Sequence, residues 1–228
     1  MSSLPNAQPV LRLDWCSYQA AKYACEKWHY SRRLSKSRNV YIGVWENNRF
    51  IGAISFGFGS GNATNGERYG LQRSHEIAEL TRVALANHSA PVSRIMSIAI
   101  RMLRRQSPGL RMLISMADPK HGHHGGIYQA TGWIYTGLTA PDVEYFWRGQ
   151  WMHHRSVTNS VSAKGLLSRP IPGKYRYLYP LDQEMRAQIA PLSKSYPKRA
   201  SSIVVDAPGD QPGEGGSEPT GALQLIPL

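Results

Sequence analysis

The chain has 228 residues, 41% of them hydrophobic, and carries a formal net charge of +12. This length suits one domain of roughly 150–200 residues with a tail, and such a domain can bury a core without disulfides or a structural metal. All 27 Lys and Arg residues precede residue 200, whereas residues 201–228 hold acidic but no basic side chains. A body this basic favours a polyanionic partner, most commonly nucleic acid, although a merely soluble basic protein has the same composition.

The two cysteines, Cys16 and Cys25, have a spacing that matches neither a CxxC pair nor a zinc motif. We expect them to be small buried residues in a reducing compartment. Residues 1–10 lack a basic segment followed by an apolar core, so no signal peptide is expected. No apolar run approaches the length of a membrane span, and we therefore expect a cytoplasmic protein.

The first third of the chain predicts a strand, a helix and a hairpin. Val10–Trp15 is predicted as a short strand, and Tyr18–Trp28 as a helix with one apolar face. Two β-rich runs follow at Asn39–Glu46 and Phe50–Phe58, and the Asn47-Asn48 pair between them is typical of a hairpin turn.

The middle of the chain predicts a strand–helix–strand unit. After an exposed Gly- and Asn-rich loop at Gly57–Gly70, the next strand is predicted at Glu76–Leu85. Pro91–Gln106 is predicted as a helix, because Pro suits its first turn and apolar residues recur at helical spacing. The apolar run Leu110–Ala117 is typical of a buried strand, so Glu76–Ala117 is predicted to be a crossover unit between parallel strands.

The rest of the chain predicts shorter elements: a helix at Gly125–Thr131, strands at Trp133–Thr139, Val143–Trp151 and Tyr175–Leu181, and a helix at Asp182–Ile189. This order predicts an α/β (α+β) fold with a mixed sheet and helices on both faces. From about Ser201 the composition cannot bury enough apolar surface to order itself. We therefore expect a catalytic domain over residues 10–192 and a disordered C-terminal tail over residues 193–228.

The first candidate site is the junction between the strand Glu76–Leu85 and the helix Pro91–Gln106. Helix N-termini present free N–H groups and bind anions, and a pyrophosphate-bearing carrier such as coenzyme A fits there. Side chains in the first turn could add hydrogen bonds to phosphate. The alternative is an ordinary capped helix. The residues expected to bind the carrier are Val83, Leu85, Pro91, Val92, Ser93 and Arg94.

The second candidate site is Ser115–Gly126, which follows a buried strand, where open α/β sheets collect functional groups. Asp118 with His121 and His123 offers a carboxylate and two imidazoles, the ligand set of non-haem iron. The alternatives are that Asp118 caps a turn and that the histidines are solvated.

The third candidate site is the aromatic and basic segment that starts at Trp28. Aromatic side chains stack on unpaired bases and arginines hold phosphates, as an enzyme that extrudes a base requires. The alternative is a helix end with a solvated basic edge. The residues predicted to contact DNA are Tyr30, Ser31, Arg32, Arg33, Lys36 and Arg38.

Arg82 is a further candidate, because it and Glu79 point to opposite faces of a strand and one of them must face a core. A buried arginine needs a partner, for which Asp118 on the neighbouring strand is a candidate. The alternative is a purely structural ion pair.

Several segments together resemble the Mom family of phage DNA-modification proteins, with the resemblance covering roughly Trp15–Ile189. They are WHYSRR (Trp28–Arg33), YIGVWE (Tyr41–Glu46), ELTRVAL (Glu79–Leu85), APVSRIMSIAIRMLRR (Ala90–Arg105), SMADPKHGHHGGIYQATGWIYTG (Ser115–Gly137) and YLYPLD (Tyr177–Asp182). The acidic tail has no counterpart in this resemblance.

The resemblance implies a GNAT-like acyltransferase fold and conversion of adenine in double-stranded DNA to an N6-carbamoylmethyl derivative, which shields phage DNA from restriction in the bacterial host. It implies acetyl-CoA as a cofactor and links iron to activity. The positions that correspond to the family's functional residues are His29, Arg82, Ser93, Asp118 and Tyr128.

For the reaction we expect Asp118, or alternatively His29, to remove a proton from the adenine amine. Tyr128 would donate a proton to the leaving group, and Arg82 would neutralise charge on the donor or orient Asp118. Two other functions stay open: a GNAT acetyltransferase acting on a small amine or a protein, and a non-enzymatic DNA-binding protein. A homodimer is as compatible with the sequence as a monomer.

Overall fold

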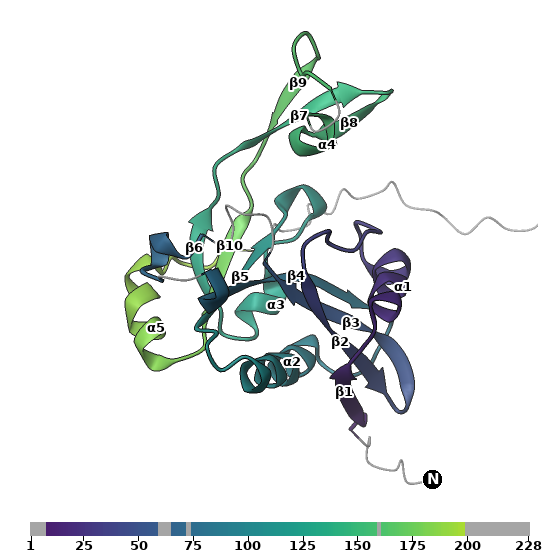
Figure 1. Cartoon of the computed structure of the whole chain (residues 1–228), viewed down its shortest axis with the longest axis vertical. Coiled ribbons are helices and arrows are strands. Elements are labelled where there is room, and N and C mark those ends of the chain that lie inside the picture. Colours follow the sequence, from purple (N-terminus) through teal and green to yellow (C-terminus); the bar gives the residue numbers. More distant parts are fainter. Residues whose placement is uncertain (1–7, 59–64, 72–73, 159–160, 199–228) are drawn as a thin grey trace, which may run out of the picture. The chain divides into compact units, whose positions relative to one another are not determined.

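A computed structural model describes residues 8–58, 65–71, 74–158 and 161–198 of the chain (Figure 1). These residues belong to one compact unit, Met1–Lys198. Of the predicted tail, residues 193–198 contact the domain, because Lys194 N–H donates to the Tyr135 carbonyl and the Tyr196 hydroxyl donates to that of Trp133. The rest of the predicted tail and residues 59–64 of the predicted loop lie outside the described residues.

A seven-stranded sheet forms the centre of the domain, with the strand order β1-β2-β3-β4-β5-β10-β6. Its neighbouring strands are antiparallel except for the parallel pair β4 and β5. This mixed sheet confirms the predicted α/β fold class. The strands are β1 (Leu11–Trp15), β2 (Asn39–Glu46), β3 (Arg49–Gly57), β4 (Ile77–Leu85), β5 (Met112–Ala117), β6 (Ile134–Leu138) and β10 (Tyr175–Pro180).

Helices cover both faces of this sheet, as predicted. The helix α2 (Val92–Gln106) connects β4 to β5 and buries an apolar stripe that includes Ile95 and Ala99 in the largest core cluster. On the opposite face, α1 (Tyr18–Trp28) packs Ala21 and Ala24 against small residues of β3 and β4. The short helices α3 (Gly126–Gln129) and α5 (Gln183–Ile189) pack beside α2 and beside β10, respectively.

The pairing of β4 with β5 is short, and this opens the sheet. It covers Ile77–Glu79 opposite Met112–Ile114, and beyond these residues the two strands separate. On its other side, β4 pairs with β3 through a register shift that leaves Thr81 as an extra residue. Such a bulge bends a strand and re-aims its side chains. The middle of β4 therefore faces an opening instead of a neighbouring strand.

One predicted strand was wrong. Instead of one strand at Val143–Trp151, β7 (Asp142–Trp147) and β8 (Gln150–His153) form a hairpin whose turn has positive φ at Arg148 and Gly149. Aromatic residues on both sides of the turn favour a strand, so the sequence predicts one continuous strand. Gly149 between them is the residue that signals the turn.

The hairpin belongs to a second, three-stranded sheet in the order β8-β7-β9. The strand β9 (Ser168–Ile171) was not predicted, because it has only four residues and contains a proline. The helix α4 (His154–Thr158) directly follows β8. Figure 1 shows this small sheet projecting beside the end of the main sheet at which β6 and β10 lie.

No helix among the described residues is long and apolar enough to cross a membrane. Both cysteines are free thiols, with Cys25 buried in the core under α1 and Cys16 half-buried. Burial raises the pKa of Cys16 to about 11, which keeps this thiol protonated and unreactive at neutral pH.

Candidate active site

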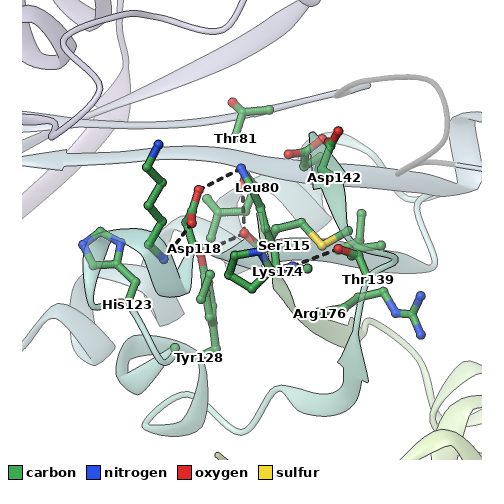
Figure 2. Close-up of a pocket in the computed structure, with 18 of the residues that line it drawn as sticks. Leu80, Thr81, Ser115, Asp118, His123, Tyr128, Thr139, Asp142, Lys174 and Arg176 are labelled. Atoms are coloured by element: carbon green, nitrogen blue, oxygen red, sulfur yellow. Dashed lines mark hydrogen bonds and ion pairs between the residues drawn. The ribbon is translucent and has the colours of Figure 1, made fainter. Parts of the chain in front are cut away.

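A cavity of about 1140 Å³ lies where β4 and β5 separate (Figure 2). Its walls come from the end of α1, the middle of β4, the segment after β5 and the segment before β10. The four residues predicted to be catalytic, which are scattered over the sequence, all line it: His29, Arg82, Asp118 and Tyr128.

Asp118 follows β5 directly and accepts hydrogen bonds from its surroundings on two sides. Its carboxylate accepts from Lys120 N–H at 3.0 Å and forms an ion pair with Lys174 Nζ at 3.0 Å (Figure 2). Burial acts to raise the pKa of Asp118, but the contacts with Lys174 and Lys120 outweigh it and lower the pKa. Asp118 is therefore ionised at neutral pH, which suits charge stabilisation and orientation of substrate better than strong basicity.

Arg82 does not form the ion pair with Asp118 that we expected. Its guanidinium donates to the Arg33 carbonyl at 2.9 Å and to the Thr81 carbonyl at 2.6 Å. The partner of Asp118 is Lys174, a residue from the segment before β10 that is remote in sequence. Arg82 thus ties the basic segment after α1 to the β4 bulge while it lines the cavity.

His29 ends α1 and is 8% exposed. Burial, with the neighbouring Arg82, His123 and His121, lowers its pKa to about 4, so the imidazole is neutral at physiological pH. Its Nδ1 lies 3.1 Å from Ser31 N–H, which can only donate. The ring proton of the neutral imidazole must therefore be on Nε2, which makes His29 a hydrogen-bond donor to a ligand.

Tyr128 is the end of a buried hydrogen-bond chain. Ser115 Oγ lies 2.9 Å from the Leu80 carbonyl, to which it donates its single proton, and 2.8 Å from the Tyr128 hydroxyl. The Tyr128 hydroxyl is therefore the donor to Ser115. Burial raises the pKa of Tyr128 to about 12, which keeps the phenol protonated at neutral pH.

Tyr30 lies among three imidazoles at the cavity. Its ring centroid is 4.3 Å from that of His29, 4.5 Å from that of His121 and 4.8 Å from that of His123. Tyr30 is 48% exposed, so part of its ring is free to stack on a planar ligand. His121 and His123, the predicted metal ligands, flank this ring, and their ring centroids are 6.3 Å apart.

The predicted coenzyme site lies mostly beside the cavity. Of the six residues predicted to bind the coenzyme, only Val83 lines the cavity. The other five lie outside it, at the end of β4 and at the start of α2. The buried Glu46 carboxylate accepts from the N–H groups of Ser89 at 3.0 Å and Ala90 at 2.7 Å. These bonds lower the pKa of Glu46, and α2 begins just after them without a side-chain cap.

The basic segment after α1 has both structural and exposed residues. Arg32 has a positive φ of 51°, and its guanidinium donates to the carbonyls of Glu26 and Lys27 at the end of α1. The Ser31 hydroxyl contacts His29 Nδ1 at 2.8 Å. Arg33, Lys36 and Arg38 are exposed and remain the predicted phosphate contacts of this segment.

Three further residues that line the cavity were not among the predicted site residues. Ser115 was identifiable as the polar residue in the apolar strand β5, but its partners were not. Lys174 and Arg176 line the cavity from a segment that carries no motif. Such residues are found only once the sheet has formed, because β10 pairs with β5 across a long sequence separation.

Comparisons with known proteins point to one family. The Methylcarbamoylase mom of Escherichia phage Mu is 27% identical over 158 residues, which are 68% of this chain and 64% of the phage protein. The match therefore spans less than two thirds of that relative. Among solved structures, the N-acyl amino acid synthase FeeM from uncultured soil microbes is 12% identical, with a TM-score of 0.46 over 82% of this chain and 99% of its own.

An IAA acetyltransferase from Bacillus cereus is also 12% identical, with a TM-score of 0.45 over 75% of this chain and 100% of its own. The model of the Mom protein family matches residues 10–198, which include every element of the described domain from β1 to α5. The chain belongs to the Mom protein family.

Proposed function

We propose that this protein is a DNA-modification transferase that converts adenine in double-stranded DNA to its N6-carbamoylmethyl derivative and so protects phage DNA from restriction. The observation that carries this proposal is the cavity between β4 and β5. It gathers an ionised carboxylate, a neutral imidazole and a protonated phenol from distant parts of a Mom-family chain.

The cavity and its surroundings suit an extruded base. At about 1140 Å³ it exceeds the usual range of about 300–1,000 Å³ for small-molecule sites, which leaves room for a nucleotide and the reactive end of a donor. The half-exposed ring of Tyr30 offers a stacking surface for adenine. Arg33, Lys36 and Arg38 follow it in sequence and are exposed, as phosphate contacts must be.

The three groups can take complementary roles in transfer to the adenine amine, a poor nucleophile whose lone pair is delocalised. Ionised Asp118 accepts a hydrogen bond from the amine, stabilises the positive charge that develops on it, and takes up the proton that the amine loses when its new bond forms. The Nε2–H of His29 stabilises negative charge on the oxygen of the donor's carbonyl. Tyr128 supplies a proton to the leaving group when its hydroxyl turns from Ser115 to the donor, while Ser115 keeps its hydrogen bond to the Leu80 carbonyl.

We propose acetyl-CoA as the donor, with its phosphates at the first turn of α2. The N–H groups of Val92 and Ser93 and the exposed Arg94 are the groups that can hold a phosphate there. Transfer of an acetyl group alone bonds N6 to a carbonyl carbon, whereas the carbamoylmethyl product has N6 bonded to a methylene carbon, so the complete reaction also needs a nitrogen source and a two-electron oxidant. The ligand atoms of Asp118, His121 and His123 do not all lie within 4.8 Å of one another, so these residues do not form a three-ligand site for iron. No step is assigned to it.

The test is nucleoside mass spectrometry of bacterial DNA after expression of the protein. We expect a deoxyadenosine carrying the added mass, absent with Asp118→Asn and retained with Asp14→Asn, a matched change at an exposed carboxylate. Unmodified DNA from cells that hold soluble wild-type protein, or full modification by Asp118→Asn, would contradict the proposal.

A further inference from the structure

Three apolar side chains form a row across the small sheet, and two of them are exposed. Phe146 of β7 pairs with Trp151 of β8, and their ring centroids are 5.5 Å apart. On the other side of β7, the Phe146 N–H donates to the carbonyl of Leu167, the residue before β9, at 2.9 Å. Phe146 is 40% exposed and Leu167 is 70% exposed. We call Leu167, Phe146 and Trp151 the apolar row.

The apolar row lies on the face of the small sheet that continues into the cavity. Side chains two positions apart on a strand point to the same face, so Phe146 shares a face of β7 with Asp142, which lines the cavity. On β8, Trp151 shares a face with His153, which also lines the cavity and lies 2.8 Å from Asp142. At about 3.3 Å per residue, Phe146 is roughly 13 Å along β7 from Asp142. One surface therefore leads from the cavity wall to the apolar row.

The segment that carries the apolar row is basic. Residues 145–170 contain no Asp or Glu, and their basic residues are Arg148, Arg155, Lys164 and Arg169. Arg169 is held within the sheet, because it pairs with Glu144 and lies 4.4 Å from the ring of Trp151. Arg148 is exposed at the tip of the hairpin, which belongs to the projecting sheet in Figure 1. A polyanion complements this surface in charge.

The turn between β7 and β8 carries an arginine at a position that favours other residues. Arg148 has a φ of 51°, in the left-handed region that Asn and Gly adopt more readily. The β2–β3 hairpin of the same chain has Asn47 and Asn48 at its two turn positions, with φ values of 50° and 65°. Residues in such unfavourable conformations cluster at ligand-binding sites. The arginine at this tip therefore indicates a use for its charge.

We propose that the β7–β8 hairpin lies in the major groove of the DNA substrate, an inference that rests on the proposed function. Phe146 and Leu167 contact base edges there, and Arg148 contacts a phosphate. The major groove is about 12 Å wide and admits a two-stranded β-ribbon, and it is the groove in which the N6 amine of adenine lies. Apolar side chains in this groove contact the C5 methyl group of thymine.

The dimensions of the hairpin agree with this position. The major groove is about 8.5 Å deep, which is less than the roughly 13 Å of strand between Asp142 and Phe146. The apolar row can therefore reach the base edges of the duplex while an extruded adenine occupies the cavity at the other end of the same surface.

The first test compares two duplexes by fluorescence anisotropy, with the full chain and without a donor. Both have thymines on each side of a central adenine, and in one of them deoxyuridine replaces every thymine. Wild type should bind the deoxyuridine duplex about fourfold or more weakly, the usual effect of one buried methyl group. Phe146→Ala and Leu167→Ala should each weaken binding to the thymine duplex by about 3–8-fold, because DNA would bury the exposed part of each side chain.

The double variant of Phe146 and Leu167 should bind both duplexes equally, since it lacks the side chains that contact the methyl groups. The matched control is Leu192→Ala, at an exposed leucine just after α5, which should prefer the thymine duplex as wild type does. If Phe146→Ala does not fold by circular dichroism, Leu167→Ala decides, because its side chain is largely outside the core.

The second test separates DNA binding from stability at Arg148. Asn suits the positive φ, so the urea midpoint of Arg148→Asn should equal or exceed that of wild type. Its affinity for the duplex should fall, and the slope of log K against log salt should decrease by about 0.9, the value for one phosphate contact. Arg186→Asn, an equal change of charge at an exposed residue of α5, should leave this slope unchanged.

Equal affinity of wild type for the two duplexes, or a wild-type salt slope for Arg148→Asn, would overturn the proposal. So would a dimer in sedimentation that Phe146→Ala dissociates, because a second copy would then cover the apolar row. Neither assay reads modification. Modified deoxyadenosine together with one of these outcomes refutes the hairpin contact alone, whereas thymine-dependent binding by a chain that leaves DNA unmodified refutes the proposed reaction alone.

Discussion

At the scale of single residues, two physical effects set the protonation states of the imidazole, phenol and carboxylate in the cavity: burial, and a neighbouring positive charge. Burial neutralises His29 and keeps the phenol of Tyr128 protonated, whereas the ammonium of Lys174 keeps Asp118 ionised. Ser31, in the loop after α1, fixes which ring nitrogen of His29 carries the proton, and Lys174, in the segment before β10, lowers the pKa of Asp118. The site therefore offers both donors and an acceptor at the same pH, as transfer to an amine requires.

Tyr128→Phe tests the acid. The phenyl ring keeps the buried volume and Ser115 can still donate to the Leu80 carbonyl, so we expect a loss of only about 1 kcal/mol of stability. Adenine modification should fall by about 10²–10⁴-fold, the usual contribution of a general acid. Thermal unfolding and nucleoside mass spectrometry measure the two effects. Modification at the wild-type rate would show that the leaving group takes its proton elsewhere.

The pKa of His29 predicts a pH-dependent stability. Because the folded pKa, about 4, lies below the ordinary value of 6.5, the unfolded chain binds the extra proton between these pH values. Stability should therefore fall as the pH drops from 6.5 towards 4, by up to about 1.4 kcal/mol per pH unit. His29→Asn should flatten this part of the profile in urea unfolding. His75→Asn, at an exposed histidine, is the control, and equal profiles for all three proteins would refute the prediction.

At the scale of elements, two departures from a regular sheet build the cavity. The bulge at Thr81 and the early separation of β4 from β5 open the main sheet, and Ser115 bonds the Leu80 carbonyl at this point. The small sheet then supplies the second wall. It is held to the segment after Asp118 by the buried Glu144, which pairs with Lys120 and Arg169.

Glu144→Gln tests this connection. Removing the charge leaves Lys120 and Arg169 without their ion-pair partner, and both are about 40% exposed, so water can replace part of the interaction. We expect a loss of about 1–3 kcal/mol, below the cost of breaking a fully buried pair. Hydrogen exchange should become faster in β7, β9 and residues 118–124 together. Faster exchange in the small sheet alone would mean that Glu144 does not hold the two parts together.

At the scale of the whole molecule, positive charge is the property on which the proposed binding of DNA depends. It is distributed over several exposed surfaces, including the segment after α1 and the exposed arginines of α2. Of these two surfaces, the segment after α1 adjoins residues that line the cavity. The position of a basic residue relative to the cavity, and not the net charge, should therefore decide its contribution to DNA binding. Homodimer formation and a cytoplasmic location stay predictions.

Two sets of substitutions with equal charge test this. Changing Arg33, Lys36 and Arg38 to Gln should weaken duplex binding and lower the slope of log K against log salt by about 0.9 for each phosphate that the protein no longer neutralises. The matched set is on α2, where Arg101, Arg104 and Arg105 are exposed, and it should change the slope less. Fluorescence anisotropy at several salt concentrations measures both. Equal slopes for the two sets would show that the position of a basic residue relative to the cavity does not decide its contribution to DNA binding.

The sequence by itself determined the elements with strong periodic patterns and the segments that carry chemistry. The helix Tyr18–Trp28 and the strand Asn39–Glu46 have their predicted bounds. The residues His29, Arg82, Asp118 and Tyr128 were identified before any contact between them was known, because a resemblance to a family preserves residue types even where it gives no distances. The sequence did not predict the turn at Arg148-Gly149 or the strand β9, because these segments are short and have little periodicity.

Only the tertiary structure decided what these residues do. It pairs Asp118 with Lys174 instead of Arg82, turns Arg32 back to the end of α1, and brings Asp142 together with His153 and His154. The physical reason is that each of these contacts joins segments through strand pairing or burial, and neither composition nor spacing specifies which surfaces meet. Protonation follows in the same way, since the pKa of a side chain depends on its depth and its neighbours.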